Sequence, residues 1–237
     1  MSNSYFRFKQ FTIHQDKCAM KVSTDACIAG AWTTLPQGTK RVLDIGAGTG
    51  LLTLMLAQKN PDIIIDGIEL DAAAATQAME NVNSSPWGER INLIQADATV
   101  YPYIYTYDFV IANPPFFNNS LLGDTAQRNM ARHTFSLSYQ NLFGIIDSCL
   151  NASGMAAILL PHTEHGHWEQ LLLDNDWSIV KKLLIHPVEG KPANRVVSIC
   201  SRISNITPVE EHLDIRNADG GYTESFNRMM SPYYLDK

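Results

Sequence analysis

The residues of this chain best suited to chemistry are Asn113-Pro114-Pro115-Phe116, which follow a short apolar run. An aromatic amine or an amide nitrogen is a poor nucleophile because its lone pair is delocalised into the adjoining π-system. Two acceptors aimed at its hydrogens, the Asn113 side-chain oxygen and the Pro114 carbonyl, would concentrate that lone pair, and proline keeps this geometry rigid. Phe116 can stack on a flat substrate. We therefore predict that these four residues orient an amine for attack on an electrophile.

A second chemical feature is the segment Asp44-Ile45-Gly46-Ala47-Gly48-Thr49-Gly50. Alternate glycines let the backbone approach a ligand closely and adopt positive φ. The spacing differs from the G-x-G-x-x-G of loops that bind a pyrophosphate, which the Asp44 carboxylate would also repel. That carboxylate suits a ligand with a cationic end, such as the sulfonium and ammonium of S-adenosylmethionine (SAM). We predict a SAM site here, with contacts from Asp44, Gly46, Ala47 and Gly48.

Two further carboxylates follow apolar runs downstream of the glycines. Glu69 comes 23 residues after Gly46, a spacing suited to hydrogen bonds with ribose hydroxyls, although it could instead cap a helix. Asp97 follows the next apolar run and can accept from the exocyclic amine of adenine, or it is a plain loop acid. Ligands of open α/β sheets bind along the edge where the strands end. The remaining predicted cofactor contacts are Lys21, Thr24, Leu70, Ala98 and Asn113.

Apolar runs and helical patterns indicate the elements that position these residues. Strands are predicted at 42–45, 61–71, 91–95, 107–112, 154–161, 178–185 and 196–203. Helices are predicted at 26–34, 51–58, 72–83, 137–150 and 164–175. Strands that alternate with helices are typical of an α/β fold with a mostly parallel sheet.

Length and composition limit the class of protein. The 237 residues, 45% of them hydrophobic, suffice for one α/β domain over 1–237. We expect an N-terminal extension that covers the cofactor (1–36), a catalytic core (37–203) and a polar tail (204–237). No apolar run is long enough to span a membrane, and Met1–Lys9 lacks the core of a signal peptide, so we expect a cytoplasmic monomer. The four cysteines show no C-x-x-C pairing, which favours free thiols over a metal site.

The charge is distributed unevenly along the chain. The net charge is -6, yet residues 1–41 carry six cations and only two acids. The basic N-terminal segment of an otherwise acidic chain could bind a polyanion. A solvated surface with mixed charges also explains this distribution. Candidate contacts to an RNA are Arg7, Lys9, Lys17, Arg128, Arg132, Lys191 and Arg195.

The glycine segment and Asn113-Pro114-Pro115-Phe116 resemble the motifs of class I SAM-dependent methyltransferases that act on amino groups through an Asn-Pro-Pro-(Tyr/Phe) site. The segments Phe8-Lys9-Gln10-Phe11, 18–25 and Arg132-His133-Thr134 are similar to those of bacterial members that methylate a tRNA adenine. The resemblance implies a Rossmann-like fold, with a mostly parallel seven-stranded sheet and an antiparallel edge strand.

The same resemblance implies the reaction. It is methyl transfer from SAM to N6 of adenine 37, next to the anticodon of a valine tRNA, tRNA1(Val). By motif position, SAM would be bound by Asp44, Gly46, Gly48, Glu69 and Asp97. The adenine would be held by Asn113, Pro114 and Phe116. An adenine in an anticodon loop is only partly stacked, so extruding it costs less than flipping a base out of a duplex.

Other functions remain open at this point. The same chemistry could act on guanine N2 of ribosomal RNA or on a glutamine amide of a release factor, although the latter enzymes usually carry tyrosine where this chain has Phe116. A nicotinamide oxidoreductase is disfavoured by the glycine spacing and by Asp44. A catalytically silent RNA-binding module is disfavoured by the intact acids and Asn113.

Overall fold

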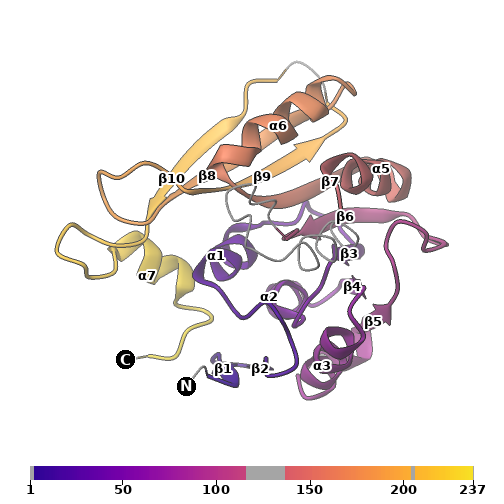
Figure 1. Cartoon of the computed structure of the whole chain (residues 1–237), viewed down its shortest axis with the longest axis horizontal. Coiled ribbons are helices and arrows are strands. Elements are labelled where there is room, and N and C mark those ends of the chain that lie inside the picture. The colour runs from indigo at the N-terminus through magenta and orange to yellow at the C-terminus, as the bar shows by residue number, and fades with distance from the viewer. Residues whose placement is uncertain (1–2, 116–136, 204–205, 237) are drawn as a thin grey trace, which may run out of the picture.

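The computed structural model describes residues 3–115, 137–203 and 206–236. Within them, eight strands form one sheet with helices on both faces, and strands alternate with helices from β3 to β5 and from β6 to β8 (Figure 1). The strands of this sheet are β3 (Arg41–Ile45), β4 (Ile64–Glu69), β5 (Ile91–Gln95), β6 (Tyr107–Ala112), β7 (Leu150–Pro161), β8 (Ser178–His186), β9 (Arg195–Ser201) and β10 (Val209–Asp214). The helices are α1 (Thr24–Trp32), α2 (Leu51–Lys59), α3 (Ala72–Asn83), α5 (Tyr139–Cys149), α6 (His162–Leu173) and α7 (Glu224–Met230), with the short 3-10 helix η1 (Gly88–Arg90).

The order of strands across the sheet is β10-β8-β9-β7-β6-β3-β4-β5. Every neighbouring pair is parallel except the two pairs made by β9, which runs antiparallel to β7 and β8. The predicted mostly parallel α/β sheet is therefore confirmed. The antiparallel strand, however, lies inside the sheet and not at its edge, because β8 and β10 continue beyond it.

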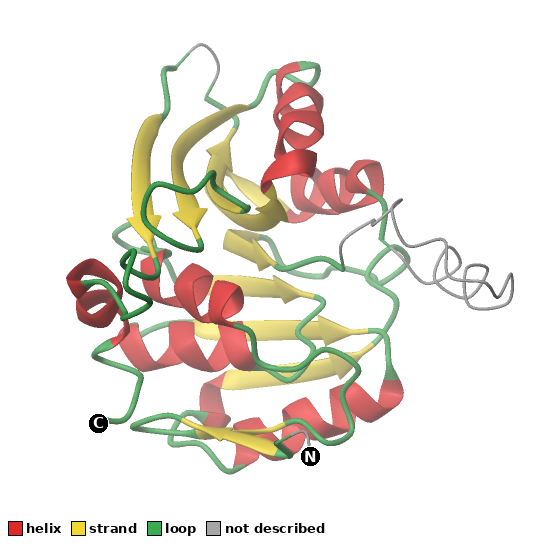
Figure 2. Ribbon diagram, turned by 60° about the vertical axis from the view of Figure 1, so that its left-hand side comes forward, coloured by secondary structure: helices red, strands yellow, loops and turns green. Residues whose placement is uncertain are grey.

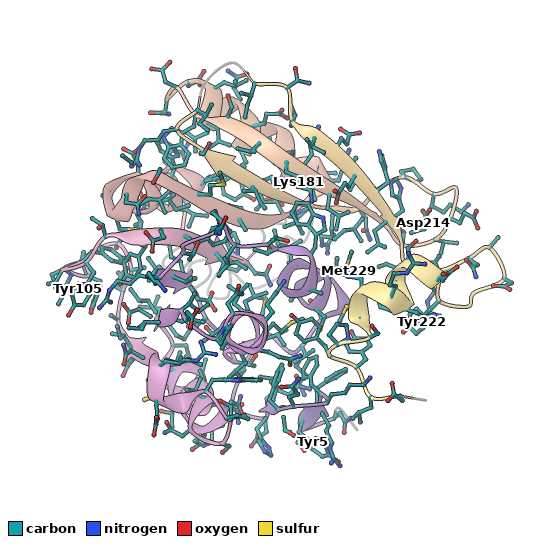
Figure 3. The ribbon with its side chains drawn as sticks, turned by 180° about the vertical axis from the view of Figure 1, so that it is seen from behind. Tyr5, Tyr105, Lys181, Asp214, Tyr222 and Met229 are labelled. Carbon is teal, nitrogen blue, oxygen red and sulfur yellow. The ribbon has the colours of Figure 1, made fainter. Side chains whose placement is uncertain are left out.

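Strand β10 extends the sheet past the seven predicted strands and falls in the segment expected to be a polar tail. Only Leu213 of this strand is buried, so the sequence lacks the apolar alternation that marks a strand. Ion pairs fasten it to β8: Lys181, labelled in Figure 3, lies 2.9 Å from Glu211, and Lys182 lies 2.9 Å from Glu210. These pairs join residues far apart in the sequence, which a local pattern cannot reveal.

Two apolar cores lie on opposite faces of the sheet (Figure 2). On one face, α1, α2 and α7 pack with buried side chains of the N-terminal hairpin, which comprises β1 (Tyr5–Arg7) and β2 (Thr12–His14). On the other face, α5 and α6 bury residues such as Ile146 and Trp168. Burial of these faces supplies the main stabilising free energy of the domain.

The hairpin and the C-terminal segment hold each other. The Lys9 backbone N–H donates to the Tyr233 carbonyl at 2.7 Å, and the Phe6 and Phe8 rings lie 5.7 and 6.0 Å from the Tyr234 ring. The two segments expected to flank a catalytic core, 1–36 and 204–237, thus pack together on one side of it. Among the residues that the structure describes, no helix is both long and apolar enough to cross a membrane.

Candidate active site

A cavity of about 410 Å³ opens where the central parallel strands end. Its wall includes the glycine segment after β3, Glu69–Asp71 after β4, Ala96–Thr99 after β5 and Asn113–Pro115 after β6. Parallel strands deliver their carboxyl ends to one edge of a sheet, which explains why residues from four separate loops meet here. The volume suits a small-molecule ligand.

The glycine segment adopts a conformation that requires glycine. Gly46, Gly48 and Gly50 have φ of 74°, 56° and 80°, in the left-handed region that side chains disfavour. The backbone N–H groups of Gly46 and Ala47 donate to the Ile68 carbonyl at 2.8 and 3.0 Å. These bonds hold the segment against the end of β4, so that its backbone lines the cavity.

Glu69 connects the glycine segment to α3. One carboxylate oxygen accepts from the Gly48 N–H at 2.8 Å, and the other accepts from the Asp71 N–H at 2.9 Å. Asp71 is the N-cap of α3, because its side chain accepts from the Ala74 N–H at 2.8 Å. Glu69 is therefore not the helix cap, and each of its oxygens retains a lone pair for a ligand.

Asp97 is also fixed by its own loop. Its Oδ1 accepts from the Thr99 hydroxyl at 2.7 Å and from the Thr99 N–H at 2.9 Å. These hydrogen bonds hold the pKa of the Asp97 carboxyl below its usual value, so the side chain is anionic at neutral pH. Asp97 lines the same cavity as Glu69, on the neighbouring loop.

Asp44 takes a different position from these acids. Its carboxylate is buried, with Oδ2 accepting from the Thr53 hydroxyl at 2.6 Å and the Thr53 N–H at 3.1 Å, and Oδ1 has no partner within the described residues. Burial raises the pKa of this carboxyl to about 6, and the nearby charge of Glu69 adds to the effect. Asp44 thus faces the first turn of α2 and is not among the residues that line the cavity.

Asn113 is one of the residues that line the cavity. Its Oδ1 is buried and has no hydrogen-bond partner among the residues that the structure describes. A buried oxygen without a donor costs free energy, so this atom is prepared for a donor that the ligand would bring. Pro114 and Pro115 line the same part of the wall. Phe116, the expected stacking residue, lies outside the described residues.

The structure places the other predicted cofactor contacts in two groups. Leu70 and Ala98 line the cavity, whereas Ala47, Lys21 and Thr24 do not. Lys21 and Thr24 are exposed at the start of α1. Lining residues that the sequence analysis missed are Cys18, Ala19, Met20, Ile45, Ile68, Asp71, Ala74, Ala96, Thr99, Leu137 and Asn141. Several of these residues lie next to a predicted contact in the sequence, and this adjacency is the sequence feature that could have indicated them.

Of the seven cations considered for RNA binding, five lie in the described residues, and three of these five have acidic partners. Lys9 pairs with Asp236 at 2.7 Å, Lys17 with Glu80 at 2.7 Å, and Arg195 with Asp25 at 3.1 Å. Arg7 and Lys191 are exposed. Arg128 and Arg132 lie outside the described residues. In the part of the chain that is described, no cluster of three potential metal ligands is found.

Comparison with known proteins identifies the family. The domain family described as "Methyltransferase small domain" matches residues 28–138. A protein of Dyadobacter fermentans named tRNA1(Val) (adenine(37)-N6)-methyltransferase is 40% identical, with 98% of each chain covered. A Yersinia enterocolitica protein of the same name is 36% identical, with 98% of this chain and 92% of the relative covered.

Solved structures support the fold. A predicted O-methyltransferase from Agrobacterium tumefaciens superposes with a TM-score of 0.65 at 15% identity, covering 88% of this chain and 96% of that one. A glycopeptide N-methyltransferase solved with SAM gives a TM-score of 0.55 at 12% identity, covering 78% and 96% of the two chains. Both share the SAM-dependent methyltransferase fold that the sequence predicts.

The cavity also fits this cofactor. Carboxylates on neighbouring loops, a glycine backbone and an apolar lining match the hydroxyls, the amino groups, the cationic sulfonium and the apolar parts of SAM, and Glu69, Asp97 and Gly48 would hold it. When bound, SAM supplies an electrophilic methyl group. The chain belongs to the tRNA1(Val) (adenine(37)-N6)-methyltransferase family, whose cofactor is SAM.

Proposed function

We propose that this protein methylates N6 of adenine 37 in tRNA1(Val), with SAM as the methyl donor. The observation that carries the proposal concerns Asn113, which lines the cofactor cavity: its Oδ1 is buried and has no hydrogen-bond partner among the described residues. The names of the full-length relatives supply the substrate. A tRNA substrate fits a cytoplasmic enzyme, and we propose that the enzyme acts as a monomer.

The chemistry follows from the placement of Asn113. One N6 hydrogen of adenine would be donated to the Asn113 Oδ1 and the other to the Pro114 carbonyl. This pair of bonds localises the nitrogen lone pair and aims it into the cavity. No strong base is required beforehand, because the nitrogen becomes acidic once methylated and then loses its proton to solvent. Orientation therefore provides most of the acceleration.

The cofactor would be held by the loops that surround Asn113. Glu69, fixed by the Gly48 and Asp71 N–H groups, is placed to accept from the ribose hydroxyls. Asp97 would accept from the adenine amine through the oxygen that Thr99 leaves open. Asp44 would act through the glycine segment and α2, since its carboxylate faces Thr53.

The RNA would dock beside the loop between β8 and β9. Arg195 pairs in register with Pro161 at the end of β7, so this loop lies at the same sheet edge as Asn113. Lys191 is exposed within it, and Arg195 begins β9. Lys9 is instead paired with Asp236 beside the C-terminal segment. We therefore favour Lys191 over Lys9 as a phosphate contact, and Arg195 could contribute only by exchanging its partner Asp25 for a phosphate.

Methylation of total tRNA and ribosomal RNA by the purified protein, followed by nucleoside mass spectrometry, tests the proposal. We expect N6-methyladenosine in tRNA. Guanine N2 methylation of ribosomal RNA, or the absence of a methylated nucleoside from both RNAs, would contradict the proposal.

Asn113 variants test the mechanism. Asn113→Ala should bind SAM almost normally and lose about 10²-fold or more in kcat, the scale of removing one oriented polar group. Asn113→Asp keeps an acceptor and should outperform alanine. If the aspartate variant equals the original enzyme and its pH–rate profile gains an acidic limb, proton abstraction and not orientation drives the reaction.

A further inference from the structure

Helix α3 buries two amide side chains on one face. Gln77 and Asn81 are one turn apart and only 1% exposed each. A buried amide costs free energy unless its donors and acceptors find partners. The partners of these two lie mainly in residues 14–17, which lead from the N-terminal hairpin to the residues 18–20 that line the cavity.

Asn81 joins three parts of the chain. Its Oδ1 accepts from the His14 N–H at 2.9 Å, and its Nδ2 donates to the His14 carbonyl at 2.9 Å. The same Nδ2 also donates to the Thr49 carbonyl at 2.9 Å. One side chain on α3 therefore fixes both the end of β2 and the glycine segment that lines the cavity.

Gln77 continues this arrangement one turn earlier. Its Oε1 accepts from the Lys17 N–H at 2.9 Å, and its Nε2 donates to Asp16 Oδ1 at 2.8 Å. A third amide closes the segment itself: the Gln15 Oε1 accepts from the Val22 N–H at 2.8 Å. Residues 16–22, which we name the strap, are thus docked on α3 and closed into a loop.

The strap forms part of the cofactor site. Cys18, Ala19 and Met20 line the cavity together with Asp71 and Ala74 from the first turn of α3. The strap contains no regular secondary structure, so side-chain amides replace the backbone ladder that would otherwise order it. A wall ordered before binding spares the cofactor the entropic cost of ordering it.

We propose that Gln77 and Asn81 are positioning residues for SAM, which hold the strap and the glycine segment in the geometry that binds the cofactor. The inference rests on the cofactor site assigned above. It assigns a function in binding to two side chains that do not line the cavity. They act through backbone groups of His14, Lys17 and Thr49 and through the carboxylate of Asp16.

Cys18 offers a direct report on the strap. Burial, together with the charges of Glu69 and Asp71, raises the pKa of the Cys18 thiol to about 11, so the docked strap should alkylate slowly at pH 8. The other three cysteines, Cys27, Cys149 and Cys200, are buried in α1, α5 and β9. Their alkylation reports opening of the core, so the four thiols separate a local release from general unfolding.

The experiment alkylates the cofactor-free protein with iodoacetamide and follows each cysteine by mass spectrometry. In Asn81→Ala and Gln77→Ala, Cys18 should react about tenfold faster, the scale of one net hydrogen bond, with the other thiols unchanged. Calorimetry should show SAM binding weakened by about tenfold, again the effect of one such bond. Asn83→Ala is the matched control, because Asn83 lies on the same helix with an exposed side chain.

The labelling and binding results distinguish a positioning role of Gln77 and Asn81 from a role in general stability. The proposal is overturned if both variants label and bind SAM like Asn83→Ala, or if all four thiols accelerate together, since the amides would then serve only general stability. Gln77→Ala leaves the Asn81 bonds intact and carries the same expectations should Asn81→Ala not fold. Cys18 labelling needs neither SAM nor RNA, whereas absence of SAM binding by the unaltered protein would refute the proposed function instead.

Discussion

Replacing Asp44 by asparagine tests how the buried acid next to the glycine segment is held. The carboxyl is 1% exposed, accepts from Thr53, and has a pKa raised by burial from 3.8 to about 6. A shift of about two pKa units corresponds to about 3 kcal/mol between the protonated and ionised forms. Asparagine has nearly the same shape, can accept the same Thr53 hydrogen bonds and does not ionise.

Because the pKa of Asp44 is raised in the folded protein, its contribution to the free energy of unfolding falls as the pH rises. Between about pH 3.8 and pH 6, the folded protein keeps a proton on Asp44 that the unfolded chain has already released. The stability gained from that proton is full below this window and is lost as the pH rises through about 6. The free energy of unfolding of Asp44→Asn, minus that of the unaltered protein, should therefore increase by about 3 kcal/mol from pH 4 to pH 7.5.

Urea unfolding of the cofactor-free proteins at pH 4, 5, 6 and 7.5 measures this difference. Contributions from titrating groups that do not interact with Asp44 cancel in the subtraction, so the change with pH reports on Asp44 and its coupling to Glu69. Asp62→Asn, at an exposed position, is the matched control. A difference that stays constant across the range, or that shrinks as the pH rises, would refute the reasoning from burial.

Two other results are expected. Glu69→Ala and Asp97→Ala should each weaken SAM binding by about 1.5–3 kcal/mol in calorimetry, the worth of a charged hydrogen bond. Glu69→Ala should also lower the thermal unfolding temperature, because Glu69 holds the Gly48 and Asp71 N–H groups. Unchanged SAM affinity in both variants would remove the two acids from the site. Lys191→Glu should weaken tRNA binding and reduce the salt slope by about one, whereas Lys9→Glu, which breaks the pair with Asp236, should not. The reverse ranking would place the docking surface on the N-terminal hairpin.

The sequence alone determined the strands that carry chemistry and the residues that end them. Apolar runs before Gly46, Glu69, Asp97 and Asn113 are local patterns, and parallel strands necessarily bring their carboxyl ends to one edge. The fold and the set of acids near Asn113 could therefore be predicted. Phe116 lies outside the described residues, so its stacking contribution stays a prediction.

Only the tertiary structure decided where several other side chains point. It turned the Asp44 carboxylate toward Thr53, and it brought Cys18, Ala19 and Met20 to the cavity in place of Lys21 and Thr24. These outcomes depend on packing between elements, which the identity of a residue does not encode.

The ion pairs, including those that hold β10, also depend on contacts between residues far apart in the sequence, which the sequence alone does not reveal. Lys9 meets Asp236 from the opposite end of the chain, and Lys181 meets Glu211 across two neighbouring strands. A cation in the sequence indicates only the potential to bind phosphate. Whether that charge is available to an RNA is determined by which acid the fold places beside it, because a partner at 2.7–2.9 Å already satisfies it.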